Sequence, residues 1–313
     1  MYSKNSKLVA LLGGREYKDS ETFKRFLIPP IREKLKQDGI DLIVATNNPK
    51  SAEQFEQIKD LKVVRTSEEI HEEFVARQRE IKTNLGAETR ETINQYAIQN
   101  KYKYACHLDD NIISLFIKYQ GKNKIITKNR AQAFYEIIKL LFYISEHSNI
   151  GAIGIEMSAF GGKTNQTRIT AGFPYSFFVH RVDDKFVFEN STEDDILMSI
   201  YNGENKKPSA VIRNLLYYGK TGKKTAQDGN RKIYNLMLKD NKRGEYASKM
   251  YPHIYSRKVS YMVKSSTYQK EPFLQHKHTL KKPKQWDLDL RIDDTVMPEI
   301  YRVANTITER EYK

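Results

Sequence analysis

The N-terminal half of the chain alternates short apolar runs with amphipathic segments. The apolar runs, which have the length of buried strands, are residues 7–12, 41–46, 61–66 and 102–108. The helical patterns between them are residues 20–39, with a break near Pro29 and Pro30, residues 50–59 and residues 86–100. Strands that alternate with helices need crossover connections, so this pattern predicts a mostly parallel sheet with helices on both faces.

The pattern changes beyond residue 130. Residues 131–148 are apolar with helical spacing, whereas residues 149–162 and 167–182 alternate as strands do, and the apolar segment 185–191 follows a turn. We therefore expect a mixed or antiparallel extension of the sheet. Farther along, the pattern predicts a helix capped by Ser191 or Thr192, a helix at 229–242, a strand at 255–264 and a helix at 298–310.

The predicted fold is therefore α/β, with a Rossmann-like, mostly parallel central sheet flanked by helices. A chain of 313 residues can bury a substantial core. We expect residues 1–202 to form that core, and residues 203–313 to form a basic C-terminal region packed on it.

Positive charge is concentrated in that C-terminal region. The chain has a formal net charge of +14, and residues 203–285 alone hold 20 Lys and Arg against 5 Asp and Glu. This asymmetry indicates a polyanionic partner such as nucleic acid, and the alternative is a solvated lysine-rich surface. The candidate phosphate contacts are Lys220, Lys223, Lys224, Arg231, Lys232, Arg257 and Lys258. The interleaved tyrosines that offer stacking faces are Tyr217, Tyr218, Tyr234, Tyr246, Tyr251, Tyr255, Tyr261 and Tyr268.

The single cysteine, Cys106, excludes an internal disulfide framework and a cysteine-based zinc site. It lies within a predicted strand, where we expect an inert thiol in the core. The apolar run near the N-terminus is too short for a membrane span and lacks the form of a signal peptide. We therefore expect a soluble cytoplasmic protein.

Polar residues follow each of the predicted parallel strands. Ligands of such sheets gather at the carboxyl ends of the strands, which meet at one edge. The candidate ligand-binding residues at this edge are Gly13, Gly14, Arg15, Thr46, Asn48, Arg65 and Asp109.

The cluster Asp109-Asp110-Asn111 follows the fourth predicted strand. In extended chain Asp109 and Asn111 face one side and Asp110 the other. Their oxygen atoms suit Mg²⁺ or Mn²⁺ carrying a diphosphate, and the alternative is a strand-ending turn.

A second acidic cluster, "EDDIL" at residues 193–197, begins the later helix. The order of the two clusters resembles the GT-A glycosyltransferases, with Asp109, Asp110 and Asn111 at the family's D-x-D motif. Glu193, Asp194 and Leu197 match its later E-D-x-x-L motif, although Asn111 replaces the second carboxylate of the first one. The segment 86–100 resembles the helix that precedes D-x-D, which implies that Gly86 and Arg90 approach the nucleotide. A late histidine often completes the metal ligands in this family, which makes His253, His276 and His278 candidates, although a structural role or a phosphate contact is the commoner use of such a residue.

This resemblance implies a metal-dependent transfer of sugar from a nucleotide diphosphate sugar, such as UDP-glucose, to a hydroxyl group. Asp194 would act as the base of an inverting attack, and Glu193 or Asp195 would orient the acceptor. "HLDDNI" and the basic C-terminal region also resemble phage and kinetoplastid enzymes that glycosylate hydroxymethylated pyrimidines in DNA, so the location would be a host cytoplasm if a phage encodes the chain. The alternatives are a protein or glycan acceptor, a sugar-phosphate nucleotidyltransferase, and a metal-dependent nuclease or nucleic-acid-binding protein.

Overall fold

The computed structural model describes residues 6–81, 85–119, 121–158, 167–188, 194–219, 245–262 and 273–312. The strands of the large sheet are β1 (Lys7–Leu12), β2 (Ile40–Thr46), β3 (Lys62–Arg65), β4 (Tyr104–Leu108), β5 (Ile112–Tyr119), β6 (Lys122–Ile125), β7 (Ala152–Met157), β8 (Ile169–Ala171), β9 (Phe177–Arg181) and β10 (Ala210–Gly219). A separate hairpin consists of β11 (Tyr255–Met262) and β12 (Phe273–Leu280).

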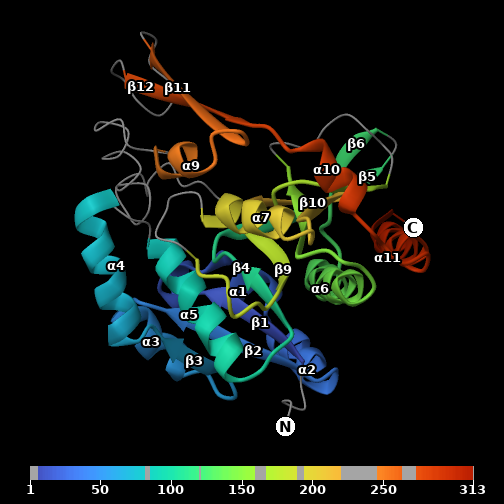
Figure 1. Ribbon diagram of the computed structural model, residues 1–313. Coiled ribbons are helices and arrows are strands. Elements are labelled where there is room, and N and C mark those ends of the chain that lie inside the picture. The colour runs from blue at the N-terminus through green and yellow to red at the C-terminus, as the bar shows by residue number, and fades with distance from the viewer. Residues whose placement is uncertain are drawn as a thin grey trace.

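The helices lie around this sheet (Figure 1). They are α1 (Glu21–Phe26), α2 (Pro29–Gln37), α3 (Pro49–Glu56), α4 (Glu68–Ile81), α5 (Leu85–Gln99), α6 (Arg130–Glu146), α7 (Asp194–Glu204), α9 (Glu245–Met250), α10 (Lys284–Asp289) and α11 (Val296–Tyr312), with a 3₁₀ turn at Tyr17–Asp19.

The central sheet has the strand order β3-β2-β1-β4-β9-β7-β10-β5-β6, and β8 pairs with β10. Strands β1 to β4 are parallel, β9 runs against both β4 and β7, and β10 is parallel to β7 but antiparallel to β5. The predicted α/β fold, with a largely parallel sheet and a mixed extension, is therefore confirmed. This topology is compatible with a Rossmann-like arrangement.

Both faces of β1 and β4 are buried, as their nearly continuous apolar sequences require, whereas the edge strand β3 is partly exposed. Along β1, Val9 and Leu11 pack with α1, α2 and α6, whereas Leu8 and Ala10 pack toward α5. Cys106 is fully buried on β4, as expected for a core thiol.

Local signals explain where several helices begin. Asn48 caps α3 by accepting hydrogen bonds from the backbone N–H groups of Lys50 and Ser51. Pro29 and Pro30 occupy the first turn of α2, where the missing N–H groups cost no helical hydrogen bond, and they separate α1 from α2.

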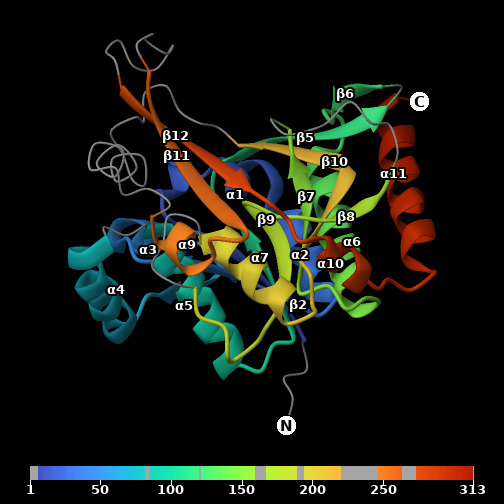
Figure 2. The same ribbon diagram turned by 45° about the horizontal axis from the view of Figure 1, so that its top comes forward.

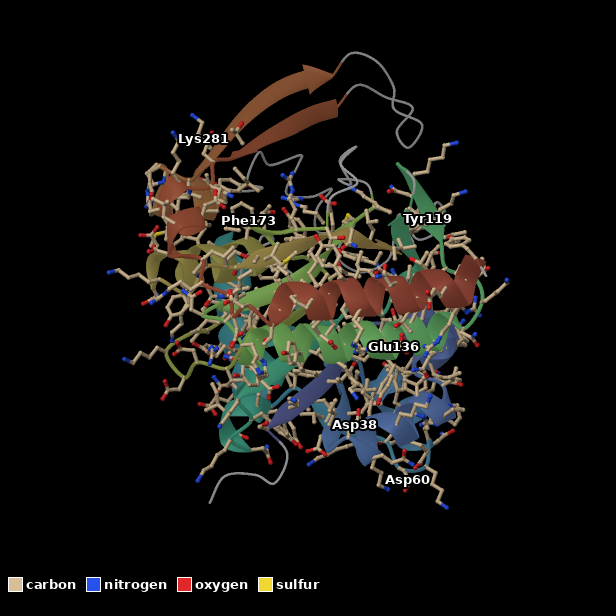
Figure 3. All side chains as sticks on the ribbon, turned by 90° about the vertical axis from the view of Figure 1, so that its right-hand side faces the viewer. Asp38, Asp60, Tyr119, Glu136, Phe173 and Lys281 are labelled. Atoms are coloured by element: carbon tan, nitrogen blue, oxygen red, sulfur yellow. The ribbon has the colours of Figure 1, made fainter. Side chains whose placement is uncertain are left out.

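The C-terminal region continues the core rather than forming a separate layer. β10 lies between β7 and β5 in the central sheet, so the expected boundary at residue 202 falls within one sheet. Helix α11 packs beside α6 (Figure 3), where Arg310 pairs with Glu136. Figure 2 shows the β11–β12 hairpin extending from the body beyond α9.

Trp286 of α10 fixes this region against α7. Its ring is fully buried and lies so close to Gly203 that a Cβ atom at residue 203 would be 2.1 Å from the ring. Only glycine permits this approach, so Gly203 and Trp286 form a matched pair.

Some expectations differ from the structure or fall outside it. Residues 185–188 form no strand, although Phe186 and Phe188 are buried. The expected helix at 229–242 lies outside the described residues. Among the residues that are described, no helix is long and apolar enough to span a membrane.

Candidate functional site at the carboxyl edge of the sheet

Arg90 of α5 joins the two acidic clusters that lie far apart in the sequence. Its Nη2 atom lies 3.1 Å from Oδ1 of Asp109, just after β4, and its Nε atom lies 2.8 Å from Oδ2 of Asp194, the first residue of α7. The side chains of Arg90 and Asp194 are 6% and 7% exposed, whereas that of Asp109 is 24% exposed. Asp109 therefore offers the more open of the two carboxylates.

The Arg90 guanidinium group remains charged in this buried position. Burial opposes the charge, but Asp194 and then Asp109 outweigh it, so the pKa of Arg90 is raised. The group also lies over the ring of Phe178, 5.1 Å from its centre. Two carboxylates and an aromatic face thus fix the orientation of Arg90.

The two carboxyl groups at the start of α7 are both harder to ionise than usual. Burial raises the pKa of Asp194, and Arg90 is the strongest opposing influence. Burial and then the neighbouring charge of Asp194 raise the pKa of Asp195 to about 8. Arg90 thus acts most strongly against this rise at Asp194, and a pKa of about 8 leaves Asp195 mostly protonated at pH 7.

Asp110 turns toward a different cation. Its Oδ1 atom lies 3.5 Å from Nη1 of Arg15, in the loop after β1. Burial raises the pKa of Asp110 to about 7, although Arg15 acts against this rise. The alternation expected from the sequence thus places Asp109 and Asp110 against separate guanidinium groups.

Asn111 presents an unsatisfied oxygen at the same edge. Its Oδ1 atom is buried without a hydrogen-bond partner among the described residues. Gly219, at the end of β10, lies so close that a Cβ atom there would be 3.1 Å from this oxygen. The Asn111 side chain therefore has an acceptor oxygen without a partner next to the backbone of Gly219.

This arrangement fits a divalent cation only in part. The described part of the chain contains no group of three or more His, Cys, Asp and Glu side chains that could hold a metal. Asp109 and Asn111 can offer one carboxylate and one amide oxygen, which are suitable ligands for Mg²⁺ or Mn²⁺. The remaining ligands would have to come from a bound diphosphate and water.

The loops after β1 and β2 are tied together beside this site. Thr46 donates a hydrogen bond of 2.6 Å from Oγ1 to the carbonyl oxygen of Gly13. The Asn48 side chain donates to the carbonyl oxygen of Gly14 at 3.5 Å, and Ser51 donates to those of Gly13 and Arg15. Most of the predicted ligand-binding residues at the sheet edge thus belong to one hydrogen-bonded network, in which Thr46 itself is buried.

Other candidates lie elsewhere. Arg65 pairs through two nitrogens with Glu56, both at 2.9 Å, on the exposed side of β3. His253 lies 3.9 Å from Glu204, at the end of α7 opposite Asp194, so it does not reach the carboxylates. Gly86 lies one turn before Arg90 in α5.

The predicted nucleic-acid contacts lie largely beyond the described residues. Arg257 and Lys258 occupy paired positions of the β11–β12 hairpin, opposite His278 and Lys277. Two tyrosines expected to offer stacking faces, Tyr217 and Tyr255, are buried in the core and cannot do so, whereas Tyr218 is exposed. The candidates outside the described residues are Glu193, Lys220, Lys223, Lys224, Arg231 and Lys232.

The sequence reading did not include two features that support the site. Thr22 of α1 donates from Oγ1 to the carbonyl oxygen of Asp109 and accepts from the N–H group of Ile112. His107 stacks on Phe178 beneath Arg90, His180 contacts the same ring edge-on, and burial lowers the pKa of both histidines. The sequence did contain a signal for these histidines, because each is a polar residue within an otherwise apolar strand, β4 or β9.

The comparisons with known proteins give no identification. A scan against protein-family models and a search of curated proteins found no match to this chain. The functional argument therefore rests on the geometry of the sheet edge.

Proposed function

We propose that the protein is a GT-A-like glycosyltransferase that moves a sugar from a nucleotide diphosphate sugar to a hydroxyl group. The observation that carries this proposal is the ion-paired triad Asp109–Arg90–Asp194, which brings both acidic clusters to one place. The mixed α/β sheet with polar loops at its carboxyl edge supports the same interpretation.

The edge offers complementary groups for a nucleotide diphosphate. The loop of Gly13, Gly14 and Arg15 and the residue Asn48 would line the nucleotide, and the buried Thr46 would hold this loop in place. Arg15 would lie near the diphosphate, because it already reaches Asp110 beside the cluster. A divalent cation held by Asp109 and Asn111 would neutralise the negative charge on the leaving diphosphate.

The acceptor hydroxyl needs a base when its oxygen bonds to the sugar carbon C1. The proton would pass to a carboxylate at the start of α7 as the bond from C1 to the diphosphate oxygen breaks. Asp194 is our choice, because Arg90 lies 2.8 Å from its Oδ2 atom and opposes the rise in its pKa that burial causes. Asp195, with a pKa of about 8, would then orient the acceptor as a neutral carboxyl group.

We further propose that the acceptor is a hydroxymethylated pyrimidine in DNA. The basic content of residues 203–285 and the extended β11–β12 hairpin support a polyanionic acceptor. A base in duplex DNA would have to be flipped out of the stack to reach a carboxylate as buried as Asp194.

The test is release of nucleoside diphosphate from a panel of nucleotide sugars with Mn²⁺ or Mg²⁺, with and without hydroxymethylated DNA. We expect release that depends on the modified DNA. Cleavage of the DNA with no sugar turnover would identify a nuclease instead, and transfer to protein or glycan alone would keep the transferase but change the acceptor.

The role of Asp194 is tested by Asp194→Asn, with the exposed Asp294→Asn as the matched control. Transfer is expected to fall by about 10²- to 10⁴-fold in the first variant while donor binding, measured by calorimetry, is retained. If donor binding is lost as well, or if Asp195→Asn alone has the larger effect on transfer, Asp194 is not the base.

A further inference from the structure

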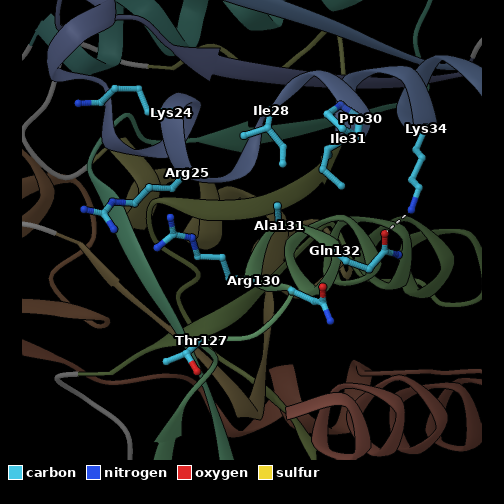
Figure 4. A pocket seen from close by; sticks show the side chains of 11 residues that line it. Lys24, Arg25, Ile28, Pro30, Ile31, Lys34, Thr127, Arg130, Ala131 and Gln132 are labelled. Carbon is cyan, nitrogen blue, oxygen red and sulfur yellow. Dashed lines mark hydrogen bonds between the residues drawn. The ribbon is translucent and has the colours of Figure 1, made fainter.

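A basic cavity lies between α1, α2 and the start of α6, outside the proposed catalytic site. Its volume is about 630 Å³, and it opens to solvent (Figure 4). Its apolar floor includes Ile28, Ile31 and Ala131. The charged residues that line it are all basic, namely Lys24, Arg25, Lys34 and Arg130. We call this cavity the basic groove.

Much of this charge is not neutralised by neighbouring acids. Arg130 has no ion-pair or hydrogen-bond partner among the described residues, and Lys34 donates to the neutral side chain of Gln132. Glu21 offsets part of the charge, because it pairs with Arg25 at 2.6 Å and approaches Lys24 at 3.8 Å. The groove therefore retains uncompensated positive charge from two of its walls.

The start of α6 adds to this potential. The first turn of this helix contains no acidic residue, and its N-cap residue Asn129 makes no capping hydrogen bond through its side chain. No acidic residue of this first turn offsets the partial positive charge of the helix N-terminus. Glu311 accepts hydrogen bonds from the backbone N–H groups of Thr127 and Lys128 just before the helix, and so offsets part of the potential.

The topology places the groove at the same edge of the sheet as the carboxylates. β1 and β6 run in the same direction, so the chain leaves both strands at one edge before it enters α1 and α6. Thr22, two residues before Lys24, also donates its backbone N–H to the carbonyl oxygen of Asp110 at 3.1 Å. A polymer bound in the groove would thus lie next to the Asp109–Asn111 turn.

We infer that the basic groove binds the phosphodiester backbone of duplex DNA. The cations are distributed along two walls rather than directed at one point, with Lys24 and Lys34 toward opposite ends (Figure 4). This distribution fits a series of phosphates better than one small anion. The inference rests on the proposed function for the choice of DNA as the polymer. That the polymer is negatively charged follows from the basic residues of the groove alone. It adds a contact surface in a half of the chain whose overall charge is nearly neutral.

The test is the salt dependence of DNA binding, measured by fluorescence anisotropy with a short labelled duplex and the full chain. The variant is Lys24→Ala with Arg130→Ala. Each lost phosphate contact lowers the slope of log K against log salt by about 0.9. In the double variant the magnitude of this slope is therefore expected to be smaller by about 2. Between about 50 and 200 mM salt, the affinity of the variant should then fall about tenfold less than that of the wild type.

The matched control is Lys59→Ala with Lys101→Asn, which removes the same charge from exposed residues. These lysines precede β3 and β4, so they lie at the opposite edge of the sheet. Asparagine is chosen at residue 101 because Lys101 has a positive φ of 59°. The control variant is expected to keep the wild-type slope.

Equal slopes for the two double variants, or an unchanged slope for the groove variant, would overturn the inference. The inference would also be overturned if the groove variant lost binding to vesicles that contain phosphatidylserine but kept its DNA binding, because the groove would then bind a membrane surface. The measurement needs no donor sugar, so it decides the groove even if no sugar transfer is found. Transfer to DNA with an unaltered slope would reject the groove and keep the proposed function.

Discussion

Two arginines at the same edge of the sheet carry their charge in opposite settings. Arg90 is buried between Asp109 and Asp194 and stacks on Phe178. Arg130 is exposed in the basic groove, with no partner among the described residues. A buried, compensated charge fixes the geometry of its neighbours, whereas an exposed and uncompensated one remains available to a ligand. The difference indicates that α5 organises the site and that α6 offers a binding surface.

The largest expected effect comes from Arg90→Met, which keeps side-chain bulk but leaves Asp109 and Asp194 without their shared cation. Loss of one partner from a buried ion pair costs about 3–5 kcal/mol, so the free energy of unfolding should fall by that amount in urea titrations at pH 7. Arg15→Met, which removes a half-exposed partner of Asp110, should cost below about 1 kcal/mol. Similar losses in the two variants would remove the distinction between the pairs.

A second prediction concerns the histidines beneath Arg90. Burial lowers the pKa of His180 to about 4, so the unfolded chain takes up this proton at a higher pH than the folded chain does. The contribution of neutral His180 to the free energy of unfolding is therefore fully present above pH 6.5 and is lost as the pH falls toward 4. Relative to His180→Phe, the wild type should lose up to about 1.4 kcal/mol per pH unit in this range.

Comparing the wild type with this variant isolates His180 from other groups. Arg90 and His107 face it in both proteins, and Asp110 and Asp195, whose pKa values are raised, titrate in both with the opposite sign. Urea titrations at several pH values measure the difference. A constant difference from pH 7 to pH 5 would mean that His180 is not held neutral by the fold.

The smallest effect is expected at Arg130. Because its side chain is exposed and unpaired, Arg130→Ala should change the free energy of unfolding by less than about 0.5 kcal/mol while weakening DNA binding. Arg65→Ala, which removes an exposed pair with Glu56, should also cost below about 1 kcal/mol and leave DNA binding unchanged. A large loss of stability in Arg130→Ala would show that this side chain belongs to the scaffold.

The local patterns of the N-terminal half were sufficient to predict its sheet. The runs at 7–12 and 41–46 correspond closely to β1 and β2, because buried parallel strands are apolar on both faces. β10 was not recognised, since Arg213 and Asn214 interrupt its apolar pattern. Their partners, Glu156 and Thr167, come from distant parts of the chain, and only tertiary structure brings them together.

The site was predictable in its parts but not in its assembly. Asp109 and Asp194 were identified from the order of two short motifs, and Arg90 from its position before the first motif. That one guanidinium group lies between both carboxylates depends on how α5 and α7 pack, which no local pattern specifies. The basic groove was also missed, because its cations come from two segments, near residues 24–34 and 127–132, that are far apart in the sequence and meet only through the packing of α1, α2 and α6.

The contact between Gly203 and Trp286 has a practical consequence for shortened forms of the protein. A chain cut before residue 286 would lose the indole that covers the glycine of α7, and so would expose the helix that begins with Asp194. The segment that contains Trp286 thus holds in place the helix that carries the acidic residues. Fragments made to isolate the N-terminal sheet should therefore retain this segment.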